Sequence, residues 1–288
     1  MEKKVIIEDN IVFTIQNNTL IEMKNIEESR DVFIPHMLST GDIIASIASQ
    51  FCKGDYSSIV ISDEITNIEK RAFYEAKCPK VQWSAGCKTI PEYCFHYSLL
   101  KEIEGIEGVT TIERGAFDST WIENIVWPSG CYTMPTACFQ NTELKTISNT
   151  QNIIDIKESA FAFTNIEKFT WPSNCKSIPT RCFSGSELET LSNISDVEEI
   201  GKEAFEHCNL KEFDWPGKCK RIPNRCFTNT PLEKINNVQN VISIGKIAFF
   251  RTKLKGIDLS WSPYLYIDIA EDAFEGIDAQ NIALPYYM

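Results

Sequence analysis

The chain has 288 residues, of which 43% are hydrophobic and 24% are charged, so it carries enough apolar side chains to form a core and is not expected to be disordered. Asp and Glu number 40 against 28 Lys and Arg, which gives a net charge of −12. This acidic excess argues against nucleic acid and anionic membrane surfaces as main partners, because both are polyanions.

Residues 1–40 do not follow the pattern of the rest of the chain, and we expect them to form an N-terminal cap built on a β-hairpin. Asp9-Asn10 and Asn17-Asn18 indicate turns between strands. The N-terminus shows no continuous apolar leader or cleavage site, and no run of the chain is long enough to span a bilayer. Residues 42–51 (DIIASIASQF) have a more helical pattern, and residues 56–62 (YSSIVIS) are expected to form the first repeat strand.

A fixed repeat occupies residues 41–275. It is marked by a series of phenylalanines spaced 22 residues apart, except that the last follows after 25 residues. They are Phe51, Phe73, Phe95, Phe117, Phe139, Phe161, Phe183, Phe205, Phe227 and Phe249, and then Phe274. A constant period of this length indicates a solenoid, in which each short unit buries its apolar side chains against its neighbours. Residues 276–288 are expected to form a C-terminal tail or cap.

Two kinds of unit alternate along the repeat, which gives a longer period of 44 residues. Both kinds follow the pattern L-x-x-I-x-Z, with apolar residues at positions 1 and 4, and tryptophan alternates with glycine or asparagine at position 6. These residues are Trp83, Gly105, Trp127, Asn149, Trp171, Asn193, Trp215 and Asn237. A second apolar segment follows, as in residues 109–117 (VTTIERGAF), and both segments suit short strands joined by tight corners. The predicted fold class is a β-rich α/β solenoid of about ten 22-residue coils.

Eight of the eleven cysteines belong to the repeat and stand where the alternate units carry Val, Ile or Ala. We interpret them as small buried core residues. Equivalent cysteines lie two coils apart, about 10 Å on the spacing of paired strands, which is beyond disulfide reach. A zinc site would require four converging ligands. A bridge within one coil, such as Cys131 to Cys138, remains an open alternative. The odd number of cysteines favours free thiols, either in a reducing compartment or in a surface protein that keeps its thiols buried.

Position 6 of the units is interpreted as pointing into the core. Large tryptophans and small asparagines in alternate coils would then interdigitate, and the asparagines would hydrogen-bond the backbone of the turns from inside. The alternative is an exposed tryptophan stripe that stacks on sugars or peptides. Trp171→Ala distinguishes the two, because a core tryptophan is expected to contribute about 3–5 kcal/mol to stability.

The outward positions 2, 3 and 5 of the strands carry mixed charges, and this exposed sheet face is the candidate binding surface, as extended solenoid faces often are. Its candidate residues are Glu123, Asn124, Lys145, Glu167, Lys168, Thr170, Glu189, Lys211, Glu212, Asp214, Glu233, Lys234, Lys255 and Asp258. The alternative is a solvated face of mixed charge without a partner.

The repeat frame brings none of the three histidines, His36, His96 and His207, near a candidate nucleophile or acid. We therefore predict no catalytic residues, no metal site and no cofactor, and we do not expect an enzyme. Asn193-Ile194-Ser195 matches the glycosylation acceptor pattern, which matters only if the protein is secreted.

Residues 166–183 (IEKFTWPSNCKSIPTRCF) and 197–205 (VEEIGKEAF) resemble the leucine-rich repeats of the BspA-like, or treponemal, family, and the resemblance covers about residues 40–275. It implies a right-handed leucine-rich-repeat solenoid, in agreement with the crossover rule. It also implies a non-enzymatic, protein-binding module of cell-surface or secreted adhesion type. The alternative is a cytoplasmic scaffold that presents the same face to an internal protein. The partner, the oligomeric state and the location are left open, and no membrane insertion is expected.

Overall fold

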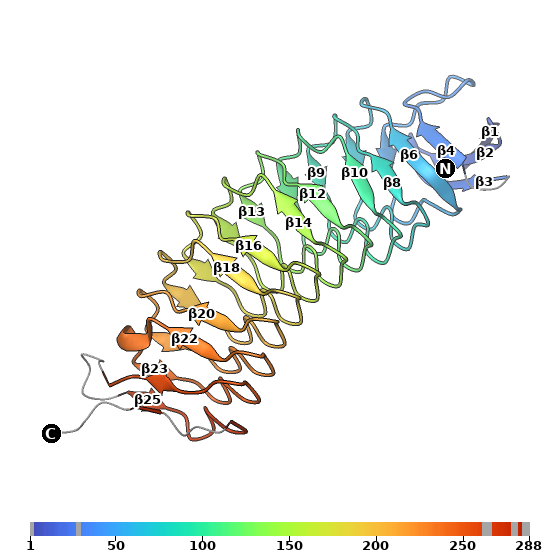
Figure 1. Cartoon of the computed structure of the whole chain (residues 1–288). Helices are drawn as coiled ribbons and strands as arrows, with labels where there is room; N and C mark the ends of the chain where they lie inside the picture. Colours follow the sequence, from blue (N-terminus) through green and yellow to red (C-terminus); the bar gives the residue numbers. More distant parts are fainter. Residues whose placement is uncertain (1–2, 27–29, 261–266, 278–281, 284–288) are drawn as a thin grey trace. The chain divides into compact units, whose positions relative to one another are not determined.

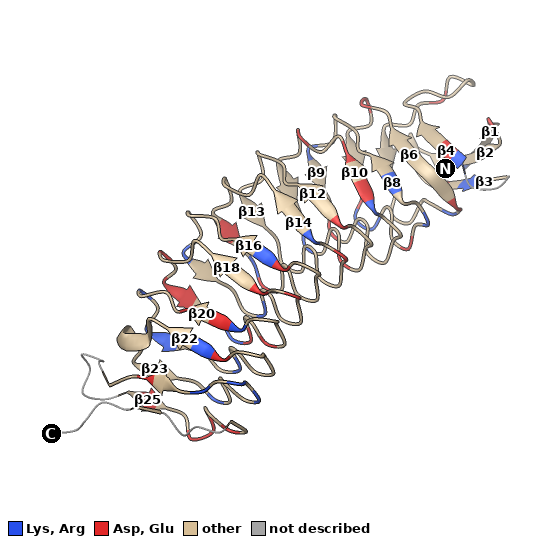
Figure 2. Ribbon diagram, in the orientation of Figure 1, with Lys and Arg blue, Asp and Glu red and all other residues tan. Residues whose placement is uncertain are grey.

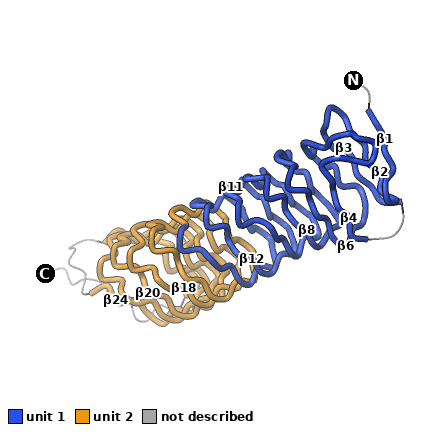
Figure 3. Tube along the Cα trace, turned by 90° about the horizontal axis from the view of Figure 1, so that it is seen from above, with its two compact units in different colours: residues 1–152 blue, residues 153–288 orange. Residues whose placement is uncertain are grey.

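The computed structural model describes residues 3–26, 30–260, 267–277 and 282–283 (Figure 1). The chain divides into two compact units, residues 1–152 and 153–288, and each is described by itself (Figure 3). Both units consist of short β-strands joined by turns. Among the described residues, the one helical element is the 3-10 helix η1, Val238–Asn240.

Unit 1 begins with an antiparallel sheet of three strands. They are β1 (Lys4–Glu8), β2 (Ile11–Gln16) and β3 (Thr19–Asn25). The two turns fall at Asp9-Asn10 and Asn17-Asn18, as the sequence indicated, and these four residues have φ angles of 49–60°. Asn and Asp tolerate this left-handed conformation better than most residues do. β3 then pairs in parallel with β5 (Ser46–Ile47), so the hairpin leads directly into the repeat.

The rest of unit 1 consists of two rows of parallel strands, which we call the long strands and the short strands. The long strands are β4 (Arg30–Ile34), β6 (Tyr56–Ile61), β8 (Lys80–Gln82), β10 (Glu102–Glu104), β12 (Asn124–Val126) and β14 (Thr146–Ser148). The short strands are β5, β7 (Asn67–Ile68), β9 (Thr89–Ile90), β11 (Thr111–Ile112) and β13 (Thr133–Met134). β6 forms where the first repeat strand was predicted.

Unit 2 has the same two rows. Its long strands are β16 (Lys168–Thr170), β18 (Thr190–Ser192), β20 (Glu212–Asp214), β22 (Lys234–Asn236), β24 (Ile257–Asp258) and β26 (Ile282–Ala283). Its short strands are β15 (Asp155–Ile156), β17 (Ser177–Ile178), β19 (Glu199–Ile200), β21 (Arg221–Ile222), β23 (Ser243–Ile244) and β25 (Asp268–Ile269). Lys168 pairs with Thr190, one repeat period further along the chain, whereas Ser243 pairs with Asp268 across the longer final step. The repeat length therefore sets the register of the sheets, including that final step.

The expected helical pattern of residues 42–51 is not a helix in the structure. This segment contains the short strand β5 and turns, and its apolar residues Ile44, Ile47 and Phe51 are buried. Their spacing of three and four residues also arises in a coil that passes from a short strand into a turn, so the spacing alone did not distinguish the two. The described residues contain no α-helix, and the solenoid is better called β than α/β.

The phenylalanines of the repeat form a stacked ladder in the core of each unit. In unit 1, the Phe117 ring lies 5.8 Å from Phe95 and 5.3 Å from Phe139 between centroids, with interplanar angles of 2° and 4°. In unit 2, Phe249 and Phe274 stack at 5.3 Å and 4° although they are separated by the longer final step of the repeat. Stacked aromatic pairs contribute about 0.5–1.5 kcal/mol each beyond the burial of their area.

The repeat tryptophans are core residues, as predicted, and not an exposed stripe. Trp83, Trp127, Trp171 and Trp215 are at most 1% exposed. The indole Nε1 of Trp171 donates a hydrogen bond of 3.0 Å to the carbonyl oxygen of Cys175, which gives the buried N–H the partner it needs. The backbone N–H of Cys175 in turn donates to the carbonyl of Pro172 at 3.0 Å. The Trp-Pro-x-x-Cys segment thus closes a turn around its own side chain.

The position-6 asparagines do not point into the core, and this part of the prediction was wrong. Asn193 is exposed and Asn149 is half-buried, and both have a left-handed φ of 62°. The left-handed residue turns the chain after the long strand, which places its side chain outside. The predicted hydrogen bond to the backbone does form, from Nδ2 of Asn193 to the carbonyl of Trp171 at 2.7 Å.

Asn193→Ala is expected to lower the free energy of unfolding by about 2 kcal/mol. The variant loses the hydrogen bond to the Trp171 carbonyl, worth about 1 kcal/mol, and an exposed one to the Ser173 hydroxyl, and it forces alanine into the left-handed region, at about 1–2 kcal/mol. Asn193→Gly loses only these hydrogen bonds and is expected to be about 1 kcal/mol more stable than the alanine variant. Urea unfolding measures both, and a glycine variant no more stable than the alanine variant contradicts this role.

The eleven cysteines are all free and buried. Cys131 and Cys138 are separate thiols, so the structure does not contain the bridge left open by the sequence. The Sγ of Cys131 contacts the carbonyl oxygen of Val109 at 3.5 Å. Burial raises the pKa of Cys131 to about 11 and raises that of Cys138 well above its ordinary value. These thiols therefore remain protonated and unreactive near neutral pH.

Candidate functional site

Each three-residue long strand presents one inward and two outward side chains. In unit 2, Phe169 of β16 and Phe213 of β20 are buried, whereas the residues on either side of them are exposed. Successive side chains of a strand point to opposite faces, and the neighbouring strands are in register. Figure 2 shows the result in unit 2, where basic residues mark β16 and β22 and acidic residues mark β20.

The structure places all fourteen predicted site residues on or next to the long strands. Thirteen of them are exposed, and Glu233 is half-buried. Unit 1 carries three of them, which are Glu123, Asn124 and Lys145. Unit 2 carries the other eleven. We call the eleven residues of unit 2, together with the neutral polar residues between them, the long-strand face of unit 2.

Only some of the charged residues among the fourteen predicted site residues are paired with one another. In unit 1, Nζ of Lys145 lies 2.8 Å from Oε2 of Glu123 and lowers the pKa of that carboxyl. In unit 2, Lys255 pairs with Glu233 in the same way, at 2.5 Å. Six other charges of the long-strand face of unit 2 form neither an ion pair nor a side-chain hydrogen bond within the described part of the chain. They are Glu167, Lys168, Glu189, Lys211, Glu212 and Lys234. Even exposed ion pairs contribute little to stability, and these six charges form none among the described residues. The fold therefore does not require them.

Each unit has a shallow hollow on its long strands. The hollow of unit 2 has a volume of about 410 Å³, and that of unit 1 about 570 Å³. The first is lined by Glu189, Thr190, Lys211, Glu212, Asp214 and Asn236, among others. The sequence analysis missed Thr190 and Asn236 because it favoured charged side chains. Thr190 occupies outward position 3 of its unit, and Asn236 occupies outward position 5. These repeat positions could have identified both residues from the sequence.

Comparison with known proteins now bears on the family. A sequence profile of the BspA-type leucine-rich repeat region matches residues 36–145 and 154–276, in six copies. The chain belongs to the BspA-type leucine-rich repeat family. This match confirms the resemblance seen in the repeat units, and it covers most of the chain.

Solved structures of other leucine-rich repeat proteins are similar to this BspA-type chain in fold. A leucine-rich repeat protein from Bacteroides ovatus has 20% identity and a TM-score of 0.70, over 97% of this chain and 88% of that one. A leucine-rich cell surface protein from Faecalibacterium prausnitzii has 16% identity and a TM-score of 0.58, over 100% and 96%. The pneumococcal vaccine antigen PcpA has 17% identity and a TM-score of 0.52, over 99% of each chain. No curated protein sequence matches significantly. At these identities the structural likeness shows the fold alone.

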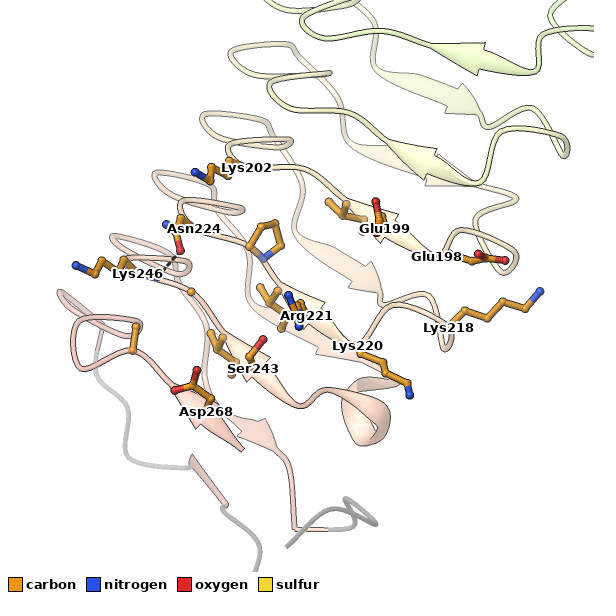
Figure 4. A pocket seen from close by; sticks show the side chains of 16 residues that line it. Glu198, Glu199, Lys202, Lys218, Lys220, Arg221, Asn224, Ser243, Lys246 and Asp268 are labelled. Atoms are coloured by element: carbon orange, nitrogen blue, oxygen red, sulfur yellow. Dashed lines mark hydrogen bonds between the residues drawn. The ribbon is translucent and has the colours of Figure 1, made fainter. Parts of the chain in front are cut away.

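A second hollow lies on the short strands of unit 2 of this BspA-type chain, with a volume of about 790 Å³ (Figure 4). Its basic lining residues are Lys202, Lys218, Lys220, Arg221 and Lys246, and its acidic ones are Glu198, Glu199 and Asp268. Acidic and basic side chains are therefore mixed along its length. The sequence analysis considered only the long strands and did not predict this hollow.

The expectation that no acid lies near a histidine was wrong for His96. Its Nδ1 lies 3.2 Å from Oδ2 of Asp118, and both side chains are largely buried. Asp118 follows His96 by one repeat period, so the repeat places the two residues in neighbouring coils. The hydroxyl of Ser119 donates to Asp118 at 2.9 Å, so the aspartate links the histidine to a serine without bringing the hydroxyl onto the imidazole.

The described residues include no group of three or more His, Cys, Asp or Glu side chains arranged to hold a metal ion. Within the same residues, no helix has the length and apolar character to cross a membrane. At the glycosylation pattern, the side-chain amide of Asn193 donates to Trp171 and to Ser173, so this amide already has a structural role.

Proposed function

We propose that this BspA-type chain binds another protein through the long-strand face of unit 2. The observation that carries the proposal is the set of six exposed charges that form neither an ion pair nor a side-chain hydrogen bond in the described structure. Three of them, Glu189, Lys211 and Glu212, line a hollow of about 410 Å³. The face holds neutral polar side chains between these charges, which supply hydrogen-bond donors and acceptors. Charged and polar groups arranged in this way steer a protein partner and select it.

The regularity of the strands supports the same proposal. Strands β16, β18, β20 and β22 repeat the outward positions at the spacing of paired strands, and the stacked core holds them in place. A partner therefore meets a surface that needs little ordering on binding, which reduces the entropic cost of association. Solenoids commonly use such repeated faces for recognition. The chain supplies binding rather than catalysis in this proposal.

We further propose that the partner lies outside the cell and that the chain is an adhesion or host-interaction module at the cell surface. The fold likeness to a cell surface protein of Faecalibacterium prausnitzii and to the pneumococcal antigen PcpA supports this choice. A second candidate is a scaffold inside the cell, which the eleven free thiols favour, since thiols persist in a reducing compartment. Antibody labelling of intact and permeabilised native cells separates the two. Signal on intact cells supports adhesion, and signal only after permeabilisation supports the scaffold.

Reversing the charges of Lys168, Lys211 and Glu212 together is expected to weaken binding of the protein partner at least tenfold. The reason is that the variant replaces attraction by repulsion at the unpaired charges of the face. The melting temperature is expected to change little, because exposed substitutions usually alter stability by less than about 0.5 kcal/mol. Surface plasmon resonance against purified matrix and plasma proteins, and against fractions of the native cell, measures the affinity.

The matched control reverses Lys202, Lys246 and Glu198, which are equally exposed but lie beside the short strands. The two variants have the same net charge, so a general charge effect acts on both alike. Equal loss of binding in the two variants, or unchanged binding in the first, contradicts the proposed face.

A further inference from the structure

A cluster of aromatic and basic side chains lies at the turns around the core phenylalanines of unit 1, away from the long strands. We call it the aromatic corner. It consists of Arg71, Tyr74, Tyr93, His96, Tyr97 and Arg114. The ring centroids of His96 and Tyr97 are 4.0 Å apart, and those of Tyr93 and His96 are 5.2 Å apart. Tyr97 is 58% exposed. The corner thus presents joined aromatic rings to solvent.

The repeat does not require aromatic residues at these positions. The coils that follow carry Gly115 and Ala137 at the position of Tyr93, and Ser119 and Asn141 at the position of Tyr97. Those coils fold with the same turns and the same buried phenylalanines. In unit 2 the corner positions carry single aromatic residues, such as Phe163 at the position of Tyr97 and Phe250 at that of His96, so the joined aromatic side chains of this corner are not required by core packing.

The ring of Tyr93 is held in a fixed place. The guanidinium carbons of Arg71 and Arg114 lie 5.7 Å and 6.0 Å from its centroid, within the range of cation–π attraction. A Cβ on Gly115 would lie 2.3 Å from Cε1 of this ring, so only glycine leaves room for the ring there. Because the aromatic side chain and its two cations are already positioned, a ligand would not have to order them.

Three nearby carboxylates have partners other than these arginines. The partners are the Tyr74 hydroxyl for Glu75, the backbone N–H of Glu92 for Glu113, and the His96 ring for Asp118. Throughout the described ranges, neither Arg71 nor Arg114 forms an ion pair with a carboxylate.

The repeat itself provides a comparison for these arginines. Arg181 and Arg225 occupy the same position before the core phenylalanine as Arg71 does. Both have a carboxylate partner in unit 2. The partners are Glu203 for Arg181 and Glu206, at 2.9 Å, for Arg225. Arg71 and Arg114 thus place two guanidinium groups beside one aromatic ring with no carboxylate of the described residues paired to either, in a chain with a net charge of −12.

We propose that the aromatic corner is a docking surface for a protein segment that carries carboxylate side chains. Arginine donates two parallel hydrogen bonds to a carboxylate, and Arg71 and Arg114 supply two such groups on either side of Tyr93. Tyrosine and arginine are also the residues that dominate binding energy at protein interfaces. This surface is separate from the long-strand face and goes beyond the proposed function, so either proposal can fail alone.

The test selects ligands from a random 12-residue peptide library displayed on phage, with the intact chain as target. Selection is repeated against the variant Arg71→Gln with Arg114→Gln. The peptides enriched on the wild-type chain are expected to be rich in Asp and Glu. Synthetic copies are expected to bind the double variant at least tenfold more weakly, with binding that weakens as salt increases.

The matched control is Arg181→Gln with Arg225→Gln, which removes the same charge from two arginines that share the repeat position of Arg71. This control is expected to bind the selected peptides within twofold of the wild type. Enriched peptides without an excess of acidic residues, or equal binding to both double variants, overturn the proposal. A glycan array run in parallel covers the other ligand class. If uronic or sialic acid glycans bind in a way that depends on Arg71 and Arg114 while no acidic peptides are enriched, that result identifies the ligand as a carbohydrate and also overturns the proposal.

Discussion

The free energy of unfolding is expected to fall between pH 7.5 and pH 9.5, and replacing four buried cysteines by alanine is expected to make that fall smaller by roughly 5 kcal/mol. The four are Cys94, Cys138, Cys182 and Cys226, and their equivalents in the alternate coils are alanines. Burial raises the pKa of each thiol well above its ordinary value. A group whose pKa is higher in the folded state stabilises the fold fully below its unfolded pKa, about 8.5, and that contribution is lost as pH rises above it. At one pH unit above this unfolded pKa, each buried thiol has lowered the free energy of unfolding by about 1.4 kcal/mol.

Urea unfolding between pH 7.5 and pH 9.5 measures this difference in the wild-type chain and in the variant. The comparison uses the change with pH, so any stability lost at neutral pH through removal of the sulfur atoms cancels. Cys182→Ala alone is the internal control and is expected to show about a quarter of the effect. An equal pH dependence of the wild-type chain and the fourfold variant would show that these thiols are not buried as neutral groups.

Trp171→Ala lowers the free energy of unfolding by about 3–5 kcal/mol, the range for a buried aromatic residue replaced by alanine. The indole is 1% exposed, contacts Phe169 and Phe183, and holds the turn to Cys175 through its N–H. The variant leaves a cavity and also removes the donor to a buried carbonyl. Denaturant unfolding at neutral pH measures the loss.

Trp121→Ala is the matched control for this variant. Trp121 is 52% exposed, and Nζ of Lys101 lies 5.9 Å from the centroid of its ring. Its replacement is expected to change stability by less than about 1 kcal/mol. If Trp171→Ala is as stable as Trp121→Ala, position 6 does not face the core and the orientation of the long strands is wrong.

The sequence predicted much of the fold because the phenylalanine spacing carries the register directly. Residues one repeat period apart lie side by side on neighbouring coils, and the single longer step appears as the longer offset between β23 and β25. The same rule would have identified the His96–Asp118 pair, whose members are one period apart. This pair was missed because outward residues were sorted by their strand position and were not compared with the residue one period away.

Other errors came from local backbone geometry that periodicity does not describe. Asn193 was placed inside because Trp171 and Trp215 share its repeat position, but its left-handed φ turns its side chain outward. For residues 42–51, apolar spacing suited a helix and a coil equally. The aromatic corner had a signal in the sequence, because Tyr93 and Tyr97 differ from the small or polar residues of the next two coils. A search for periodicity passes over such differences.

Photo-cross-linking from the long-strand face tests the central claim most directly. Thr190→Cys and Ser177→Cys each place one exposed thiol on the chain, on a long and a short strand of unit 2. A benzophenone maleimide labels this thiol near neutral pH, because the native thiols are buried. Each labelled chain is irradiated with matrix and plasma proteins and with native cell extract. We predict a discrete protein adduct from position 190 only. Unlabelled wild-type chain should suppress it, and the Lys168, Lys211 and Glu212 variant should not. Equal adducts from positions 190 and 177, or suppression by that variant, would contradict the account.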